Sequence, residues 1–267
     1  KLGLWDTFKL SMLFCPIWFC MNYTFNISLN MTSVSSNTIL STMSGPFSLL
    51  LSRCLLSTKI SVYNVGGVMI TLLGSVFIGY LDNNKNDSDQ GSMLGDALAL
   101  ISAFIYGCYV TLIKYKIKDE SSVNMFLFFG LLGLFNVLTL WPFLIALDVL
   151  KWETFAWPSP DIFGLLVLNG LISVGSDYFW AQSILYTSPV VATVGLSMMM
   201  PIAMIADEIF RGQTHSVLYW SGAVFVMLGF ILVNMDFKKQ MQEEQETDHA
   251  DGNHPEESPK LSMQQQA

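Results

Sequence analysis

The sequence predicts an all-α, polytopic membrane protein with eight transmembrane helices. Of its 267 residues, 52% are hydrophobic and only 13% are charged, whereas about 25% of the residues of a soluble domain are charged. A bilayer core about 30 Å thick requires about 20 apolar residues in a helix, and eight segments reach this length. They cover residues 9–30, 32–52, 62–81, 94–114, 123–147, 161–186, 188–209 and 216–235. Because lipid offers the backbone no hydrogen-bond partners, we expect every span to be helical.

The second span begins with an unusually polar segment, Thr32 to Pro46, in which nine of fifteen residues are Ser, Thr or Asn. This composition alone would predict a loop. However, apolar runs flank the segment, and no charged residue lies between Lys9 and Arg53. We therefore interpret it as the start of a membrane helix, with a turn limited to its first few residues.

Acidic residues collect at the C-terminal end of the chain. The segment from Glu243 to Glu257 holds seven of the 21 Asp and Glu residues and no Lys or Arg. Such a composition cannot bury enough apolar surface to fold, so we expect residues 237–267 to form a disordered acidic tail. The net charge of −8 belongs mostly to this tail.

Lys and Arg residues near the span ends predict the orientation, because they are enriched on the cytoplasmic side. Nine of them lie on the side that holds both termini and three on the opposite side. We therefore expect both termini in the cytoplasm and the loop 83–93 on the opposite side, with Asn86 in an Asn-Asp-Ser sequon as a candidate glycosylation site. Whether the membrane is the plasma membrane or an endomembrane is left open.

The chain also contains an internal repeat with a shift of 155 residues. This shift superimposes Pro46 on Pro201, Gly67 on Gly222 and Gly74 on Gly229. It carries the first three spans onto the last three, a distance of five spans. Because five is odd, the repeats must point in opposite directions across the bilayer, as in many secondary transporters.

The repeat predicts the domain organisation. Residues 94–236 form a complete repeat of five helices, and residues 1–82 form a partial repeat of three helices. We expect two further helices before the first residue of this chain, so that the whole fold has ten helices in an inverted five-plus-five arrangement.

The stretch NYTFNISLNMTSVSSNTILSTMSGPFSLLLS, residues 22–52, closely resembles the F branch of solute carrier family 35. This branch belongs to the drug/metabolite transporter superfamily, which has paired five-helix EamA-type repeats, and the resemblance covers about residues 5–236. It implies alternating access to a central cavity. The penultimate helix reads VGLSMMMPIAMIAD and lacks the lysine of the GALNK-like motif of nucleotide-sugar carriers, which argues against a nucleotide-sugar substrate.

Polar residues inside the spans are the candidates for solute binding. Asp177 is the only ionisable residue well inside a span, where a carboxylate costs about 2.5–3.5 kcal/mol and usually belongs to an ion, proton or substrate path. Alternatively, it only holds helices together. Small polar residues at helical spacing also allow close helix packing. The substrate-binding candidates are Asp177, Asn22, Asn37, Ser41, Thr38, Tyr23, Tyr178, Trp180, Thr193 and Ser197, and the candidate helix hinges are Pro46 and Pro201.

The expected function is that of a transporter of a polar organic solute, with a proton as a candidate coupling ion. The alternative is a non-transporting membrane receptor or scaffold with the same fold. No metal-ligand spacing occurs among the Cys and His residues, and no nucleophile, histidine pair or metal cluster lies at bilayer depth. We therefore expect no enzyme activity, no cofactor and no metal. The expected partners are a small solute and the lipid bilayer but no nucleic acid, and the oligomeric state is left open.

Overall fold

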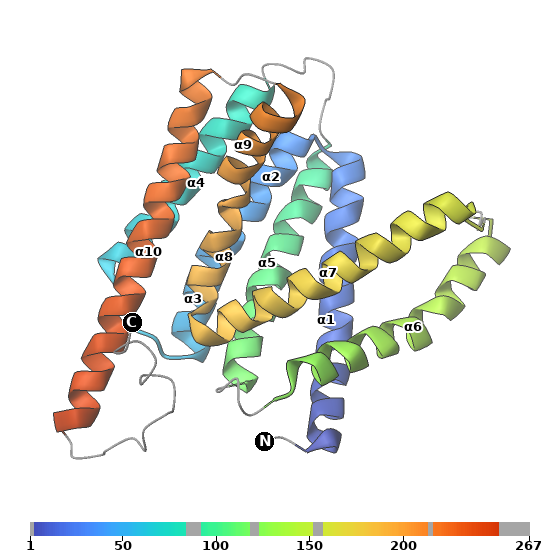
Figure 1. Ribbon diagram of the computed structural model, residues 1–267, viewed down its shortest axis with the longest axis horizontal. Helices are drawn as coiled ribbons and strands as arrows, with labels where there is room; N and C mark the ends of the chain where they lie inside the picture. The colour runs from blue at the N-terminus through green and yellow to red at the C-terminus, as the bar shows by residue number, and fades with distance from the viewer. Residues whose placement is uncertain (1–2, 84–91, 118–122, 152–156, 213–215, 251–267) are drawn as a thin grey trace.

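The computed structural model describes residues 3–83, 92–117, 123–151, 157–212 and 216–250, and all regular structure within these ranges is helical (Figure 1). In chain order the helices are α1 (Leu4–Met31), α2 (Val34–Thr42), α3 (Ser44–Leu55), α4 (Val62–Asn83), α5 (Met93–Lys116), α6 (Met125–Val149), α7 (Pro160–Tyr186), α8 (Pro189–Ser197), α9 (Met199–Arg211) and α10 (Val217–Ala250). The all-α prediction is confirmed for the described residues. Asn86, the candidate glycosylation site, lies outside them.

Six stretches of the described residues are long and apolar enough to cross a membrane, with mean hydropathies between 1.5 and 1.9. They are Val62–Leu81, Met93–Lys116, Met125–Pro142, Pro160–Tyr186, Pro189–Phe210 and Val217–Glu243. The other two predicted spans fall in α1, whose hydropathy is lowered by Asn22 and Asn26, and in the short helices α2 and α3. The structure thus supports a multi-pass membrane protein, while the number of eight spans stays a prediction.

The helix boundaries repeat at the spacing of 155 residues. α2 and α8 match residue for residue, α3 and α9 both begin two residues after them, and α4 and α10 begin at Val62 and Val217. The same local chemistry starts α2 and α8, because the side chains of Ser33 and Ser188 accept hydrogen bonds from the backbone N–H three residues ahead, at 3.1 and 3.2 Å. A serine at this position satisfies an N–H that the first turn of a helix would leave unpaired.

The predicted spans 32–52 and 188–209 are each broken into two helices, α2 and α3 in the first and α8 and α9 in the second. The N–H groups of Met43 and Met198 donate to carbonyls three residues earlier, at 3.1 and 3.0 Å, so the chain tightens at both breaks. Pro46 and Pro201 follow three residues after each break. Because proline has no N–H, it removes one α-helical hydrogen bond and weakens the helix at that point.

α4 and α10 run antiparallel and approach each other closely at four glycines (Figure 1). A Cβ atom on Gly229 would lie 2.5 Å from the carbonyl oxygen of Gly67, and a Cβ atom on Gly74 would lie 2.8 Å from the carbonyl oxygen of Gly222. We call this contact the glycine seam. The shift of 155 residues exchanges the Gly67–Gly229 contact with the Gly222–Gly74 contact, as in an interface with a local two-fold axis.

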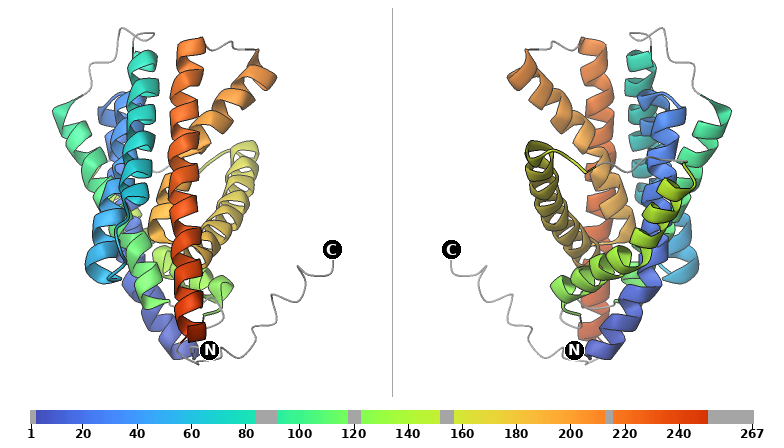
Figure 2. Two further views of the ribbon diagram at one scale, coloured as in Figure 1. Left: turned by 90° about the vertical axis from the view of Figure 1, so that its left-hand side faces the viewer. Right: turned by 90° about the vertical axis from the view of Figure 1, so that its right-hand side faces the viewer.

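α1 packs against α5 and α6, and an aromatic cluster lies between the three helices. The ring of Phe14 contacts those of Tyr109 and Phe128 edge to face, with centroid distances of 5.5 and 5.7 Å. In contrast, the C-terminal part of α6 and the N-terminal part of α7 lean away from the other helices (Figures 1 and 2). Every residue from Pro160 to Val174 is exposed, and most are apolar, as expected of a helix surface that faces lipid.

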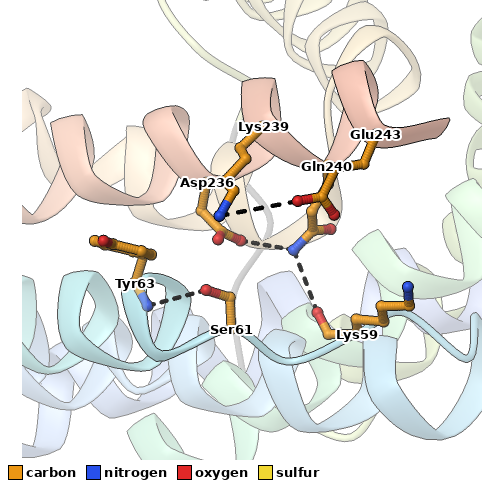
Figure 3. A network of polar contacts seen from close by, with 7 residues as sticks. All are labelled: Lys59, Ser61, Tyr63, Asp236, Lys239, Gln240 and Glu243. Atoms are coloured by element: carbon orange, nitrogen blue, oxygen red, sulfur yellow. Dashed lines mark hydrogen bonds and ion pairs between the residues drawn. The ribbon is translucent and has the colours of Figure 1, made fainter. Parts of the chain in front are cut away.

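α10 continues well past the length needed to cross a bilayer. Gln240 on this extension donates to the carboxylate of Asp236 at 2.6 Å and to the carbonyl of Lys59 at 3.3 Å (Figure 3). The bond to Lys59 attaches α10 to the connection between α3 and α4, and the bond to Asp236, which lies within α10, orients the Gln240 side chain. One turn away, Lys239 and Glu243 form an exposed ion pair at 3.8 Å.

This extension corrects the expected disorder of residues 237–267. Residues 237–250 are helical, because Lys, Gln, Glu and Met favour helix and a segment that prolongs an existing helix avoids the cost of nucleation. Residues 251–267 lie outside the described part of the chain.

Candidate functional site

A cavity of about 500 Å³ lies where the two broken helices meet α1 and α5. Its wall consists of Met21, Asn22, Phe25, Thr38, Ser41, Thr42, Ser44, Ser102, Ala103, Tyr106, Thr193, Leu196, Ser197, Met199 and Met200. Pockets that enclose small organic molecules usually have volumes of about 300–1,000 Å³. The cavity is therefore large enough for such a solute.

Five of the predicted site residues line this cavity, namely Asn22, Thr38, Ser41, Thr193 and Ser197. The repeat explains why residues so far apart in sequence meet. Thr38 and Thr193 are 155 residues apart, and so are Thr42 and Ser197, which also line the cavity. Equivalent positions of α2 and α8 thus line the same cavity.

The hinge candidates Pro46 and Pro201 do not line the cavity, but they change its chemistry. In an unbroken helix, the N–H of residue 46 would donate to the carbonyl of Thr42, and that of residue 201 to the carbonyl of Ser197. Proline lacks this donor. Two cavity-lining residues at equivalent positions therefore keep a carbonyl oxygen without its usual helical partner.

Five polar side chains of the wall donate hydrogen bonds to carbonyl groups of the chain itself. These bonds run from Asn22 to Trp18 (2.9 Å), Ser41 to Thr38 (2.9 Å), Thr42 to Ile39 (2.6 Å), Ser102 to Met21 (3.2 Å) and Thr193 to Pro189 (2.9 Å). The hydroxyl donors of the four Ser and Thr side chains are thus already used, as is one of the two N–H donors of Asn22, whereas the lone pairs of their oxygen atoms can still accept.

Asn37 does not line the cavity, although the sequence places it one turn before Ser41. Its side chain is buried and accepts a hydrogen bond from the Ser28 hydroxyl at 3.2 Å. Its Nδ2 atom has no hydrogen-bond partner among the described residues. The side chain therefore lies between α1 and α2 and holds these helices together.

Asp177 and Trp180 do not line the cavity, but both interact with tyrosines of α5. The ring of Trp180 stacks on Tyr109 and lies beside Tyr106, with centroid distances of 5.8 and 5.7 Å, and Tyr106 itself lines the cavity. Asp177 is half-buried and close enough to both tyrosines to interact with them electrostatically. None of the ion pairs found among the described residues involves Asp177.

The two remaining aromatic candidates do not line the cavity. Tyr178 stacks on Phe126 at 4.2 Å, and its hydroxyl accepts a hydrogen bond from Gln182 at 3.1 Å. Tyr23 is exposed and stacks on Phe19 at 5.6 Å. Both rings contribute to helix surfaces rather than to the cavity wall.

Sequence reasoning did not single out Ser102 and Ala103, through which α5 contributes to the wall beside Tyr106. The repeat provides no signal for them, because the position 155 residues before α5 falls outside this chain. A weaker signal does exist. Ala99, Ser102 and Ala103 put small side chains on one helix face, which allows α5 to lie close to α1 and α3.

The two pairs of half-helices around the cavity are packed differently. α3 lies against α8, and the buried hydroxyls of Ser48 and Thr193 are 2.8 Å apart. The repeat relates α3 to α9 and α8 to α2. This second pair diverges, because α9 leans away from α2 (Figure 2).

Comparison with known proteins agrees with this architecture. The sequence profile of the EamA-like transporter family matches residues 93–235, more than half of the chain. The chain belongs to the EamA-like transporter family. An uncharacterized transporter of Schizosaccharomyces pombe is 40% identical to it over 239 residues, which are 87% of this chain and 70% of that protein.

Two further relatives are longer than this chain. An uncharacterized vacuolar membrane protein of Saccharomyces cerevisiae is 40% identical over 253 residues, 90% of this chain and 64% of that protein. Solute carrier family 35 member F5 of Bos taurus is 30% identical over 238 residues, 88% of this chain and 45% of that protein. The chain thus spans less than two thirds of the length of both.

These relatives confirm the resemblance to the F branch of solute carrier family 35, whose members are transporters and not enzymes. A solved crystal structure of a protein 13% identical in sequence shares the fold, with a TM-score of 0.64 over 87% of this chain and 78% of that protein.

Proposed function

We propose that this protein carries a polar organic solute across a membrane by alternating access. The observation that carries this proposal is the unequal packing around the cavity, where α3 and α8 are joined through Ser48 and Thr193 while α2 and α9 diverge. A carrier must close its cavity on one side at a time, and such a difference between two equivalent pairs is what one state of a carrier requires.

The proposal includes two inverted repeats, at residues 1–82 and 94–236, joined by the loop 83–93. The equal helix boundaries 155 residues apart support this division, and so does the antiparallel glycine seam with its local two-fold symmetry. Inverted repeats place the substrate near the bilayer midplane between the two halves. The fold would then have eight spans in this chain, a ten-helix whole and cytoplasmic termini.

The repeat also predicts the second state. If the repeats exchange conformations, each contact between them is replaced by the contact of the equivalent residues. The Ser48–Thr193 contact is then replaced by a contact between Ala203 of α9 and Thr38 of α2. We expect α2 and α9 to close while α3 and α8 separate.

Two cysteine pairs test this exchange in the full-length protein reconstituted in liposomes, with the four native cysteines replaced by serine or alanine. Ser48→Cys with Thr193→Cys should crosslink in the state described here, and Thr38→Cys with Ala203→Cys should crosslink only in the opposite state. Uptake found in a screen of polar organic solutes should stop with either crosslink and return on reduction. Unchanged uptake by either crosslinked protein would refute alternating access.

Asp177 is the proposed site of proton coupling. It is half-buried, outside the ion pairs found among the described residues, and interacts electrostatically with Tyr106, which lines the cavity. Its repeat partner Asn22 lines the cavity but cannot carry a proton as a carboxylate does. Only one half of the pseudo-symmetric site therefore offers an ionisable group.

A further inference from the structure

The chemistry of the cavity wall restricts the class of solute that it can hold. None of the fifteen lining side chains is an Asp, Glu, Lys or Arg. Two basic side chains of α5 and α3 bind backbone carbonyls outside the cavity wall, since the Lys114 ammonium donates to the carbonyl of Leu185 and Arg53 donates to the carbonyl of Thr58. A phosphate or carboxylate in this cavity would lose its hydration without gaining an opposite charge, which is strongly unfavourable.

The hydrogen-bonding groups of the wall have a marked polarity. The hydroxyl donors of Ser41 and Thr42 are used by carbonyls of their own helix, so their oxygens face a ligand mainly as acceptors. Asn22 uses one of its two N–H donors for the Trp18 carbonyl and keeps its amide oxygen as an acceptor. Pro46 and Pro201 add the carbonyls of Thr42 and Ser197, which lack their usual helical donors. Both carbonyls also lie at the C-terminal ends of half-helices, where the helix dipole is negative. The Tyr106 hydroxyl, which has no hydrogen-bond partner among the described residues, adds one donor but no positive charge. A ligand that donates hydrogen bonds therefore fits this wall, and an anion does not.

The remaining part of the wall suits a ring. Phe25 and Tyr106 present aromatic surface, and Trp180 supports Tyr106 from behind at a centroid distance of 5.7 Å. Met21 and Met199 add flexible, polarisable side chains that adapt to the outline of a ligand. Flat faces of this kind gain from contact with a planar, conjugated group.

We propose that the cavity selects ring-bearing solutes that donate hydrogen bonds through N–H or O–H groups and that carry no phosphate or carboxylate. This inference rests on the proposed function, because it names the substrate class of the same cavity. It also gives a physical reason, independent of any motif, why a nucleotide sugar is a poor ligand here.

A test that needs no knowledge of the natural solute measures how thiol reagents of different charge enter the cavity. Ser41→Cys, in the cysteine-replaced full-length protein, reacts with a cationic trimethylammonium-ethyl or an anionic sulfonatoethyl methanethiosulfonate. Val217→Cys, which is 88% exposed and outside the cavity, corrects for the different reactivities of the two reagents. Ser197→Cys repeats the measurement on the other half of the wall.

We expect the corrected ratio of cationic to anionic labelling to be about two- to fivefold at both cavity positions, since the C-terminal end of a helix favours a cation by about 0.3–1 kcal/mol. A corrected ratio of one or less at both positions would overturn the proposal.

Matched solutes extend the test to the ligand itself. Uridine is compared with uridine 5′-monophosphate, and tryptamine with indole-3-acetate, as agents that protect Ser41→Cys from a neutral methanethiosulfonate. The member without phosphate or carboxylate should protect better, and stronger protection by the anionic member would overturn the inference. Labelling reports on the cavity and not on flux. If the cavity is labelled as expected but the protein transports no solute, only the proposed function is refuted. If the protein transports solutes but prefers anions, only this inference is refuted.

Discussion

The close approach of α4 and α10 can be tested by adding a single methyl group. In Gly229→Ala, the new Cβ atom would lie 2.1 Å from the Thr71 hydroxyl, 2.5 Å from the Gly67 carbonyl oxygen and 2.8 Å from the Thr71 nitrogen. The hydroxyl can rotate away, but the other two atoms belong to the backbone. Ordinary contacts begin at 3.4 Å, so the helices must separate by roughly 0.9 Å (3.4 minus 2.5) at the Gly67 oxygen.

Gly66→Ala is the matched control, because a Cβ atom on Gly66 meets nothing within 4 Å. Both substitutions replace a helical glycine by alanine and share the same gain in helix propensity, about 1 kcal/mol. Their difference therefore isolates the steric cost. Overpacking of a tight contact usually costs about 1–3 kcal/mol, which corresponds to about a 5- to 150-fold change in the unfolding equilibrium.

The assay is equilibrium unfolding in mixed micelles of a mild detergent and dodecyl sulfate, followed by tryptophan fluorescence. We expect Gly229→Ala to be less stable than Gly66→Ala by the amount given above. Equal stability of the two variants would show that α4 and α10 do not pack through the glycine seam, and the local two-fold symmetry inferred from this contact would fail with it.

Three further predictions concern the site and the helix ends. Asp177→Asn should abolish the dependence of uptake on a pH gradient in proteoliposomes, because an amide cannot carry the proton; the same response in both proteins would exclude Asp177 as the coupling group. Gln240→Ala should lower the free energy of unfolding by about 1 kcal/mol through loss of its bond to Asp236. Lys239→Ala should change it by less than about 0.5 kcal/mol because its ion pair is exposed. A larger loss of stability in Lys239→Ala than in Gln240→Ala would contradict the contacts drawn in Figure 3. Ser188→Ala should cost about 1 kcal/mol by removing the N-cap of α8, and unfolding measurements that find no loss would exclude this cap.

Local rules account for much of what the sequence could predict. The length of the apolar segments locates most of the helices. The internal repeat of 155 residues predicts which helices begin at equivalent positions. The polar stretch after Thr32 is helical for two reasons. Ser33 caps α2, and the apolar flanking segments keep the stretch away from water, so that its backbone groups must pair with one another. The break at Met43 was less predictable, since proline shows that a helix is weakened but not where it separates into two.

Side-chain direction was harder to predict. Asn37 and Ser41 are one turn apart, yet only Ser41 lines the cavity. Four residues advance a helix by about 400°, so the two side chains differ by about 40°, and the hydrogen bond of Asn37 to Ser28 on α1 selects which of them faces inward. Spacing defines a helix face, but tertiary contacts decide what that face meets.

The glycine seam has one more consequence for the proposed transport cycle. Its two contacts, Gly67–Gly229 and Gly74–Gly222, are exchanged with each other by the repeat. The same neighbours therefore exist whichever half adopts which conformation, and the seam can stay packed while the half-helices around the cavity open and close. A substitution in the seam then weakens both states equally and leaves their ratio unchanged. A substitution at Ser48, which touches Thr193 in one state only, alters the ratio itself.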